Sequence, residues 1–324
     1  MKRMLRCLIA SLTVVLSGLN QLAAAAYPDK PIRLIVTFPA GGVTDILGRT
    51  VGQKLAERLG QPVIIENRGG MGGSIGTQVV AKAAPDGYTL VLSNAGSFTL
   101  NTVLYKDLGY NPLKDFDPVI SVAAVTNILV VPASSPYQTL SELISAARAK
   151  PGSLSYAGTG IGASPYLCAE LLKQMAKVDI TEVSYKGAAP ALIDVLSGQV
   201  NMIFEAGATS MPHIKSGRLR PLGASSLKRV SALPDVPTIA EQGYPGFDVA
   251  AWFGIWAPAG TPSEVLHKLN TEIDAVLKLP DVVERLNGMG VEIMGGSREA
   301  FAAYHRSEFD KWTTFLRNTG IKAQ

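Results

Sequence analysis

Glycine-rich turns that lead from an apolar run into a helix are the residues best suited to chemistry in this 324-residue chain. Pro39–Gly42, Gly158–Gly162 and Gly187–Ala189 each follow a predicted strand and precede a predicted helix. A helix N-terminus exposes unpaired N–H groups and the positive end of the helix dipole, so such a turn can hold an anion. Glycine also allows close approach of a ligand because it has no Cβ atom. The alternative is that these glycines only permit tight turns.

The sequence carries no recognisable catalytic or metal-binding motif. A G-x-x-x-x-G-K-[ST] loop is missing. His213, His267 and His305 lie far apart, and each is predicted at the surface or at a helix end. Gly158–Ala163 matches the G-x-G-x-x-A dinucleotide fingerprint, but Asp179 precedes the second strand instead of ending it. We therefore expect a protein that is not an enzyme and needs no metal or cofactor.

The N-terminus is typical of a secretory signal peptide. Three basic residues precede the apolar stretch Leu8–Leu19, which is too short to span a bilayer, since that takes ~20 residues. Cleavage after Ala26 leaves 298 residues (324 − 26) with a net charge of about +1 (+4 − 3), which predicts a periplasmic protein without a nucleic-acid partner. Cys168 is then the only cysteine, so an intramolecular disulfide is impossible, and we predict a small core residue.

Strands and helices alternate along the chain, which predicts mostly parallel sheets with helices on both faces. Capping boxes are predicted to open helices at Thr139–Glu142 and Thr261–Glu264, the second with Pro262 in the first helical position. Ser93–Phe98 is predicted to be a loop, and the last helix to span Ser297–Asn318. The predicted strands are Ile32–Phe38, Val63–Glu66, Tyr88–Leu92, Leu154–Ala157, Ile180–Tyr185, Asn201–Phe204 and Leu219–Ala224.

Two extended runs, Val119–Val131 and Phe247–Ala257, are candidate crossings between two domains. With two crossings, residues 27–125 and 248–324 form one discontinuous domain, and residues 126–247 form the other. Ligands of open α/β sheets bind outside the carboxyl ends of the strands, so the glycine turns of both domains can face one another across a cleft. The weaker alternative is one large sheet.

Several long motifs resemble a known family. They include "YPDKPIRLIVTFPAGGVTDILGR", "GQPVIIENRGGMGGSIGTQVVAKAAPDGYTL" and "SALPDVPTIAEQGYPGFDVAAWFGIWAPAGTP". Together with "VSYKGAAPALIDVLSGQVNMIF" and the closing "GIKAQ", they resemble the substrate-binding proteins of tripartite tricarboxylate transporters, also called Bug-type receptors. The resemblance covers essentially all of Tyr27 to Gln324.

This resemblance implies an α/β protein with the type II periplasmic-binding-protein fold, in which two α/β domains are joined by a two-crossing hinge. It implies a bound carboxylate, such as a citrate-like di- or tricarboxylate, an acidic amino acid or an aromatic acid, held largely by backbone amides and ordered water. The expected partner is an integral membrane permease of the tripartite tricarboxylate type, and we expect a monomer. The alternatives are a sensory receptor for a signalling partner and a periplasmic enzyme that uses the same cleft.

The resemblance also places the site. Asp45 either complements the dipole of its helix or orients a ligand amine or a bridging water, and Lys186 is either a carboxylate partner or a solvated lysine. The family often has Asp-Asn after the strand that ends at Phe204, where this chain has Glu205-Ala206. The implied contacts of the first domain are Phe38, Ala40, Gly41, Gly42, Thr44 and Asp45, with Ser93, Asn94, Ala95, Gly96 and Ser97 beside them, and those of the second domain are Thr159, Gly160, Ile161, Gly162, Ala163, Ser164, Lys186, Gly187, Ala188 and Glu205.

Overall fold

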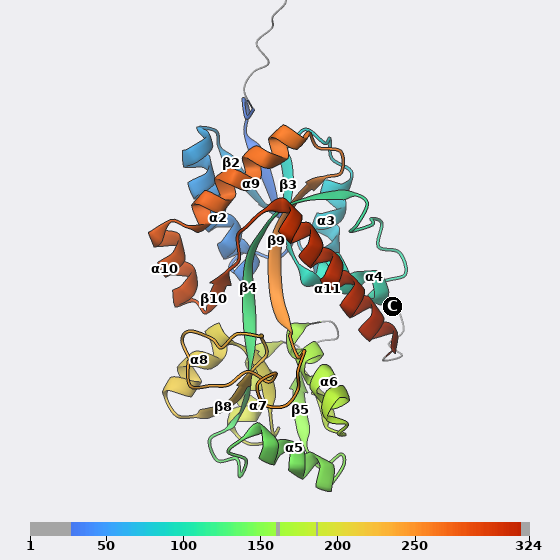
Figure 1. The fold of residues 1–324 in the computed structure, drawn as a ribbon, viewed down its shortest axis with the longest axis vertical. Coiled ribbons are helices and arrows are strands. Elements are labelled where there is room, and N and C mark those ends of the chain that lie inside the picture. The colour runs from blue at the N-terminus through green and yellow to red at the C-terminus, as the bar shows by residue number, and fades with distance from the viewer. Residues whose placement is uncertain (1–26, 160–162, 186, 319–324) are drawn as a thin grey trace, which may run out of the picture.

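The computed structural model of the chain describes residues 27–159, 163–185 and 187–318. Two lobes lie one above the other along the longest axis, and two long strands, β4 (Phe116–Pro132) and β9 (Ala250–Pro258), run through the junction (Figure 1). The first lobe contains the strands up to β3 together with β10, and the second lobe contains β5 to β8. The proposed signal peptide, residues 1–26, lies outside the described residues.

The sheet of the first lobe is ordered β10-β4-β9-β3-β1-β2. In it β1 (Ile32–Val36) pairs in parallel with β2 (Val63–Asn67) and with β3 (Thr89–Asn94). The strand β9 then pairs antiparallel with both β3 and β4, and β10 (Val291–Ile293) pairs antiparallel with β4. β2 is the edge strand of the sheet and leaves Ile64 exposed.

The second lobe is built on the far half of β4. There β7 (Ile203–Ala206) and β8 (Leu219–Ala224) pair antiparallel with β4, while β5 (Ser155–Gly158) pairs in parallel with β6 (Thr181–Ser184). The prediction of mostly parallel sheets is therefore wrong. The two crossing strands, β4 and β9, pair antiparallel with each other. Among the described residues, parallel pairing occurs only within the strand–helix–strand units of each lobe.

Helices cover both lobes (Figure 1). Helix α11 (Arg298–Asn318) begins on the first lobe, and its last turns place Trp312, Phe315 and Leu316 in an apolar cluster with Leu167 and Phe204 of the second lobe. The first lobe also carries α2 (Val43–Leu59), a 3-10 turn η1 (Met71–Gly73), α3 (Ser74–Ala81), a π-helical turn η2 (Gly96–Leu100), α4 (Asn101–Leu104), α9 (Ser263–Leu277) and α10 (Pro280–Gly288). The second lobe carries α5 (Leu140–Ala149), α6 (Ser164–Ala176), α7 (Ala188–Leu196) and α8 (Gly207–Lys215).

Helix ends test the two predicted capping boxes. At α5 the first box is confirmed, because the Thr139 side chain accepts the N–H of Glu142 at 3.2 Å. The second is wrong: the Thr261 hydroxyl instead donates to the carbonyl of Pro258 at 2.7 Å, and Pro262 is the N-cap residue of α9. Within the described ranges, no helix has both the length and the apolar character that a membrane crossing requires.

The predicted Ser93–Phe98 loop is also wrong. Ser93 and Asn94 complete β3, and a continuous helical run then extends from Ala95 through η2 and α4 to Leu104. Small residues made this segment read as a turn. Its helical form depends on burial of Phe98 and Leu100, which pack against distant parts of the chain. A helix N-terminus therefore lies where the sequence predicted only a loop.

Candidate functional site

The turn between β1 and α2 is ordered by a buried carboxylate. Asp45 is 3% exposed, and its Oδ2 atom accepts the backbone N–H of Gly41 at 2.9 Å. Arg49 donates to the same oxygen at 3.0 Å, and Asn67 donates to Oδ1 at 2.9 Å. The bond from Arg49, helped by those from Gly41 and Asn67, lowers the pKa of Asp45 to about 2 against the opposing effect of burial. Asp45 is thus ionised and engaged with the protein itself.

This arrangement decides which N–H groups the turn can offer. Gly41 has φ = 87°, a conformation that favours glycine, and its N–H is already given to Asp45. The first-turn amides of α2 have no carbonyl partner within the helix, which leaves those of Val43 and Thr44 as donors beside Gly42. The predicted anion site at this turn therefore rests on Gly42 and Thr44 rather than on Gly41.

Three buried hydroxyl groups connect the neighbouring segments. The Thr37 and Ser93 hydroxyls are 2.8 Å apart, Ser93 donates to the Ser97 hydroxyl at 2.9 Å, and Ser97 donates to the carbonyl of Gly72 at 2.9 Å. All three side chains are fully buried. Gly73 lies against this group, since a Cβ atom there would be 2.3 Å from the Ser97 hydroxyl. Ser93 and Ser97, predicted as ligand contacts, thus hold the turn around Gly72 in place in this structure.

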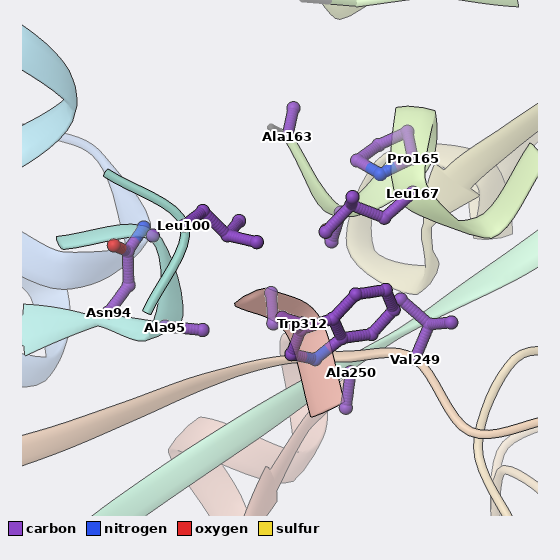
Figure 2. A pocket seen from close by; sticks show the side chains of 12 residues that line it. Asn94, Ala95, Leu100, Ala163, Pro165, Leu167, Val249, Ala250 and Trp312 are labelled. Carbon is purple, nitrogen blue, oxygen red and sulfur yellow. The ribbon is translucent and has the colours of Figure 1, made fainter. Parts of the chain in front are cut away.

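A cavity of about 210 Å³ lies where the two lobes meet (Figure 2). The first lobe contributes Asn94, Ala95 and Gly96, and Figure 2 shows Ala163 across the cavity from Asn94 and Ala95. None of its described lining residues carries a charge. The full lining is Asn94, Ala95, Gly96, Leu100, Ala163, Ser164, Pro165, Leu167, Val249, Ala250, Ala251 and Trp312.

Two helix N-termini, one from each lobe, open onto this cavity. The helical run that starts at Ala95 presents its first residues there, and α6 presents its N-cap residue Ala163, then Ser164 and Pro165. The first N–H groups of a helix lack intrahelical partners and lie at the positive end of its dipole. An anion between the two lobes could therefore be bound by backbone donors alone.

Glu205 is buried in the second lobe, in β7, and does not line the cavity. It lies at the end of β7, is 3% exposed, and its Oε1 atom accepts the N–H of Ala206 at 3.0 Å and the hydroxyl of Thr209. Its Oε2 atom has no hydrogen-bond partner among the described residues. Burial raises the pKa of this carboxyl group, and the two hydrogen bonds only partly oppose that rise.

A larger hollow, of about 730 Å³, is a poorer anion site. It lies between Met211 and Lys215 of α8 and the C-terminal end of α10 at Asn287–Gly290. A helix C-terminus presents carbonyl groups and the negative end of its dipole, so it disfavours an anion. Among the described lining residues only Lys215 is charged.

The structure brings only part of the predicted site together. Asn94, Ala95, Gly96, Ala163 and Ser164 line the cavity between the lobes. Gly160, Ile161, Gly162 and Lys186 lie outside the described residues, and the remaining predicted contacts do not line this cavity: Phe38, Ala40, Gly41, Gly42, Thr44, Asp45, Ser93, Ser97, Thr159, Gly187, Ala188 and Glu205.

Seven lining residues were not predicted. Val249, Ala250 and Ala251 lie within the second predicted crossing, so the hinge argument could have suggested them. Trp312 comes from a helix far along the chain, and no local pattern connects it with Asn94. The others are Leu100, Pro165 and Leu167, which read from the sequence as ordinary helix residues.

His305 corrects the prediction of surface or helix-end histidines. It is 2% exposed, and its Nε2 atom lies 3.1 Å from the carbonyl of Phe98. Burial lowers its pKa to about 4. The ring contacts Phe98, Trp252 and Trp256, so it is part of the packing between α11 and the sheet. Cys168 is buried, as predicted.

Comparison with known proteins identifies the family. A model of the tripartite tricarboxylate transporter family receptor matches residues 47–321. The chain belongs to this family. It is 36% identical to protein BugT of Bordetella pertussis over 302 residues, which are 93% of each chain. The predicted resemblance is confirmed.

Solved structures of similar proteins confirm the fold class of two hinged α/β domains. An R. palustris protein with adipate is 38% identical, with a TM-score of 0.78 over 92% of this chain and 100% of that one. MatC from Rhodopseudomonas palustris, with bound malate, is 34% identical, with a TM-score of 0.72 over 88% of this chain and 98% of that one. Both of those proteins hold a carboxylate.

Proposed function

We propose that this family member is a periplasmic receptor that captures a small carboxylate between its lobes and delivers it to a tripartite tricarboxylate-type permease. The observation that carries the proposal is the pair of helix N-termini, at Ala95 and at Ala163, that line one uncharged cavity. Backbone donors on both walls suit an anion that must be released again, since they bind it without a buried ion pair. The carboxylates bound by two similar proteins support the same ligand class.

We also propose that residues 27–125 and 248–324 move as one domain and residues 126–247 as the other. The pairing along β4 changes partner at the junction: Thr126 pairs with Ala250 of β9, and Asn127 pairs with Ala206 of β7. A small rotation there would close the lobes on a ligand by hinge motion. Small-angle scattering should show a smaller radius of gyration when the ligand is bound, and the same radius at saturation would contradict closure.

The turn before α2 is proposed to contact the ligand after closure. Gly42 has φ = −80°, close to the value that proline fixes, so Gly42→Pro removes one N–H donor with little change of the backbone. A hydrogen bond to a charged group contributes ~1.5–3 kcal/mol, so the variant should bind roughly 10- to 150-fold more weakly. Lys186→Met is the contrast. If Lys186→Met abolishes binding and Gly42→Pro does not, the backbone account fails.

The experiment that tests the receptor function is a thermal-shift screen of small carboxylates against the mature protein. A ligand at about 100 times its Kd should stabilise the fold by ~2.7 kcal/mol. A bound carboxylate should be recovered unchanged after denaturation, because we propose transport and no chemical conversion. Stabilisation by uncharged sugars alone would contradict the ligand class. A modified product in excess over the protein would instead indicate an enzyme.

A further inference from the structure

The C-terminal helix α11 packs against both lobes. Near its start, Phe301 contacts Trp252 of β9, with ring centroids 6.1 Å apart. Its last turns place Trp312 and Phe315 in an apolar cluster with Leu167 of α6 in the second lobe. Figure 1 shows the helix running from the first lobe down to the level of the junction. The two lobes are therefore connected by the contacts of this helix as well as by β4 and β9.

One buried carboxylate connects this helix to the crossing strand β9. Glu308 is 5% exposed, and its Oε2 atom accepts the indole N–H of Trp252 at 3.1 Å and that of Trp312 at 2.9 Å. Lys311 donates to the Oε1 atom of Glu308 at 2.9 Å and to the carbonyl of Asp248, just before β9, at 2.6 Å. Hydrogen bonds to a carboxylate are stronger than those between neutral groups, so Glu308 fixes the Trp312 indole to a strand of the first lobe.

The place of the Trp312 ring links this connection to lobe movement. The ring lines the cavity between the lobes together with Pro165 and Leu167 of α6, and it shares an apolar cluster with Leu167 (Figure 2). A rotation of the second lobe about the junction would shift Leu167 relative to an indole that Glu308 holds in place. Loss of packed apolar contact costs free energy, because it returns apolar surface to water. The last turns of α11 therefore oppose such a rotation.

We propose that α11 is a third connection between the lobes, which restrains their hinge motion, and that Glu308 is the positioning residue that keeps this connection engaged. Glu308 acts through the Trp312 indole, since it is not among the residues that line the cavity. The inference rests on the hinge motion proposed above and is independent of which carboxylate is bound. It adds a contact across the junction to the two crossings that the sequence predicted.

Distances between spin labels on the two lobes test the restraint in the mature protein without any ligand. Gln53→Cys in α2 and Ser145→Cys in α5 place one label at an exposed helix position of each lobe, and Cys168 is fully buried and should stay unlabelled. Trp312→Phe keeps an aromatic ring in the cluster but cannot donate a hydrogen bond to Glu308. We expect a broader distribution of label distances in this variant than in the wild type, because the lobes are held less firmly.

Trp256→Phe is the matched control. Trp256 is also fully buried, but its indole N–H has no hydrogen-bond partner among the described residues, so the same substitution breaks no bond there. Its distance distribution should stay as narrow as that of the wild type. Equal broadening in Trp256→Phe and Trp312→Phe would show that the lost ring volume is the cause, and it would overturn the role of Glu308.

Ser225→Ala separates the restraint from the hinge itself. The Ser225 hydroxyl bonds to Asn127 and to Val249, one residue of each crossing segment, and is remote in sequence from α11. Broadening in Ser225→Ala without broadening in Trp312→Phe would overturn the restraint by α11 and leave the hinge motion standing. A distribution that stays narrow in every variant would mean that the lobes are fixed relative to one another, and it would overturn both proposals.

Two substitutions of Glu308 test the positioning role directly. Glu308→Gln keeps an oxygen that can accept both indole N–H groups, whereas Glu308→Ala leaves them without an acceptor. In NMR spectra of Glu308→Ala, the indole N–H groups of Trp252 and Trp312 should exchange with solvent roughly tenfold faster or more, since each has lost a hydrogen bond to a charged group. The indole N–H of Trp256, the remaining tryptophan of the chain, is the internal reference and should not change.

Glu308→Gln should restore both the slow exchange at Trp312 and the narrow distribution of label distances. Equal acceleration at all three tryptophans of Glu308→Ala would indicate general destabilisation and would contradict the positioning role. If Glu308→Ala does not fold, the comparison of Trp312→Phe with Trp256→Phe decides the inference. Wild-type exchange at Trp312 together with a narrow distribution in Glu308→Ala would overturn it.

Discussion

The carboxylate of Asp45 accepts the backbone N–H of Gly41 at 2.9 Å, four residues earlier in the chain. This bond closes the turn between β1 and α2 and uses a donor that was expected to face the ligand. Arg49 and Asn67 hold the same carboxylate from the helix and from the end of β2. The role of Asp45 is therefore to shape the turn, and the amides of Gly42, Val43 and Thr44 are the proposed ligand donors.

Asp45→Asn should destabilise the protein at neutral pH. The folded-state pKa is lowered to about 2 from 3.8, so the carboxylate contributes stability above pH ~4 that is lost as the pH falls toward 2. One pKa unit corresponds to 1.36 kcal/mol, so the loss should be roughly 2 kcal/mol at pH 7. Urea denaturation at pH 7 and at pH 2.5 measures it, and the difference from wild type should shrink at the lower pH.

The matched control is Asp107→Asn, since Asp107 is an exposed aspartate outside the site. Its stability should stay within about 0.5 kcal/mol of the wild type at both pH values. A loss of the same size in both variants would mean that the turn does not depend on the Asp45 carboxylate.

His305 should make the fold sensitive to acid. Burial lowers its folded-state pKa to about 4 from 6.5, so the neutral form is preferred, and its contribution is complete above pH 6.5 and falls as the pH drops toward 4. His305→Gln can still donate to the Phe98 carbonyl without gaining a proton. Denaturation at pH 7 and pH 4.5 should show a smaller acid loss for this variant than for the wild type. The exposed His267→Gln should keep the wild-type dependence; an unaltered dependence in His305→Gln would show that other groups cause it.

The alternation of strands and helices could be predicted because each element carries its own periodicity and its own glycine or proline boundaries. The strand at Leu219–Ala224 was predicted with the bounds that the structure shows. The direction of strand pairing could not be predicted, because it depends on β9, which inserts between β3 and β4 although more than a hundred residues separate it from either strand. The long β4 strand was predicted as a crossing because Val119–Val131 is a long, mostly apolar run.

The site was less predictable than the fold. The glycines and small residues at Asn94–Gly96 and at Ala163 mark turns at which a helix begins, and such turns have a sequence signal. Leu100, Leu167 and Trp312 have none, because an apolar residue on a helix reads as core whether it packs against protein or against a ligand. Likewise, no pattern shows that Gly41 donates to Asp45 instead of to a ligand.

Ser225→Ala should loosen the junction between the lobes. The Ser225 hydroxyl accepts the N–H of Asn127 at 3.0 Å and donates to the carbonyl of Val249 at 2.6 Å, so one side chain joins both crossing segments. Leaving a buried N–H without a partner costs ~1–3 kcal/mol, and we expect that loss in chemical denaturation. Amide hydrogen exchange at Asn127 should become faster.

Ser210→Ala is the control for this variant. Ser210 is equally buried, but its hydroxyl donates only to carbonyls at the start of α8, so no N–H group loses a partner. Its cost should be the smaller of the two, and exchange at Asn127 should not change. If Ser225→Ala and Ser210→Ala have the same effect on exchange, Ser225 does not hold the crossings together.

Glu205→Gln should stabilise the protein at high pH and not at low pH. Burial raises the pKa of this carboxyl group, so the folded state favours the protonated form. The free energy of unfolding therefore falls as the pH rises above 4.5, the pKa of the unfolded state, toward the pKa of the folded state. Glutamine keeps an oxygen for the Ala206 N–H and the Thr209 hydroxyl but carries no charge to bury. Denaturation at pH 8 and pH 4 measures the effect, with Glu284→Gln, at an exposed glutamate, as the control. A gain of equal size at both pH values would show that the charge is not the cause, and a loss at pH 8 would show that the buried carboxylate has a stabilising partner.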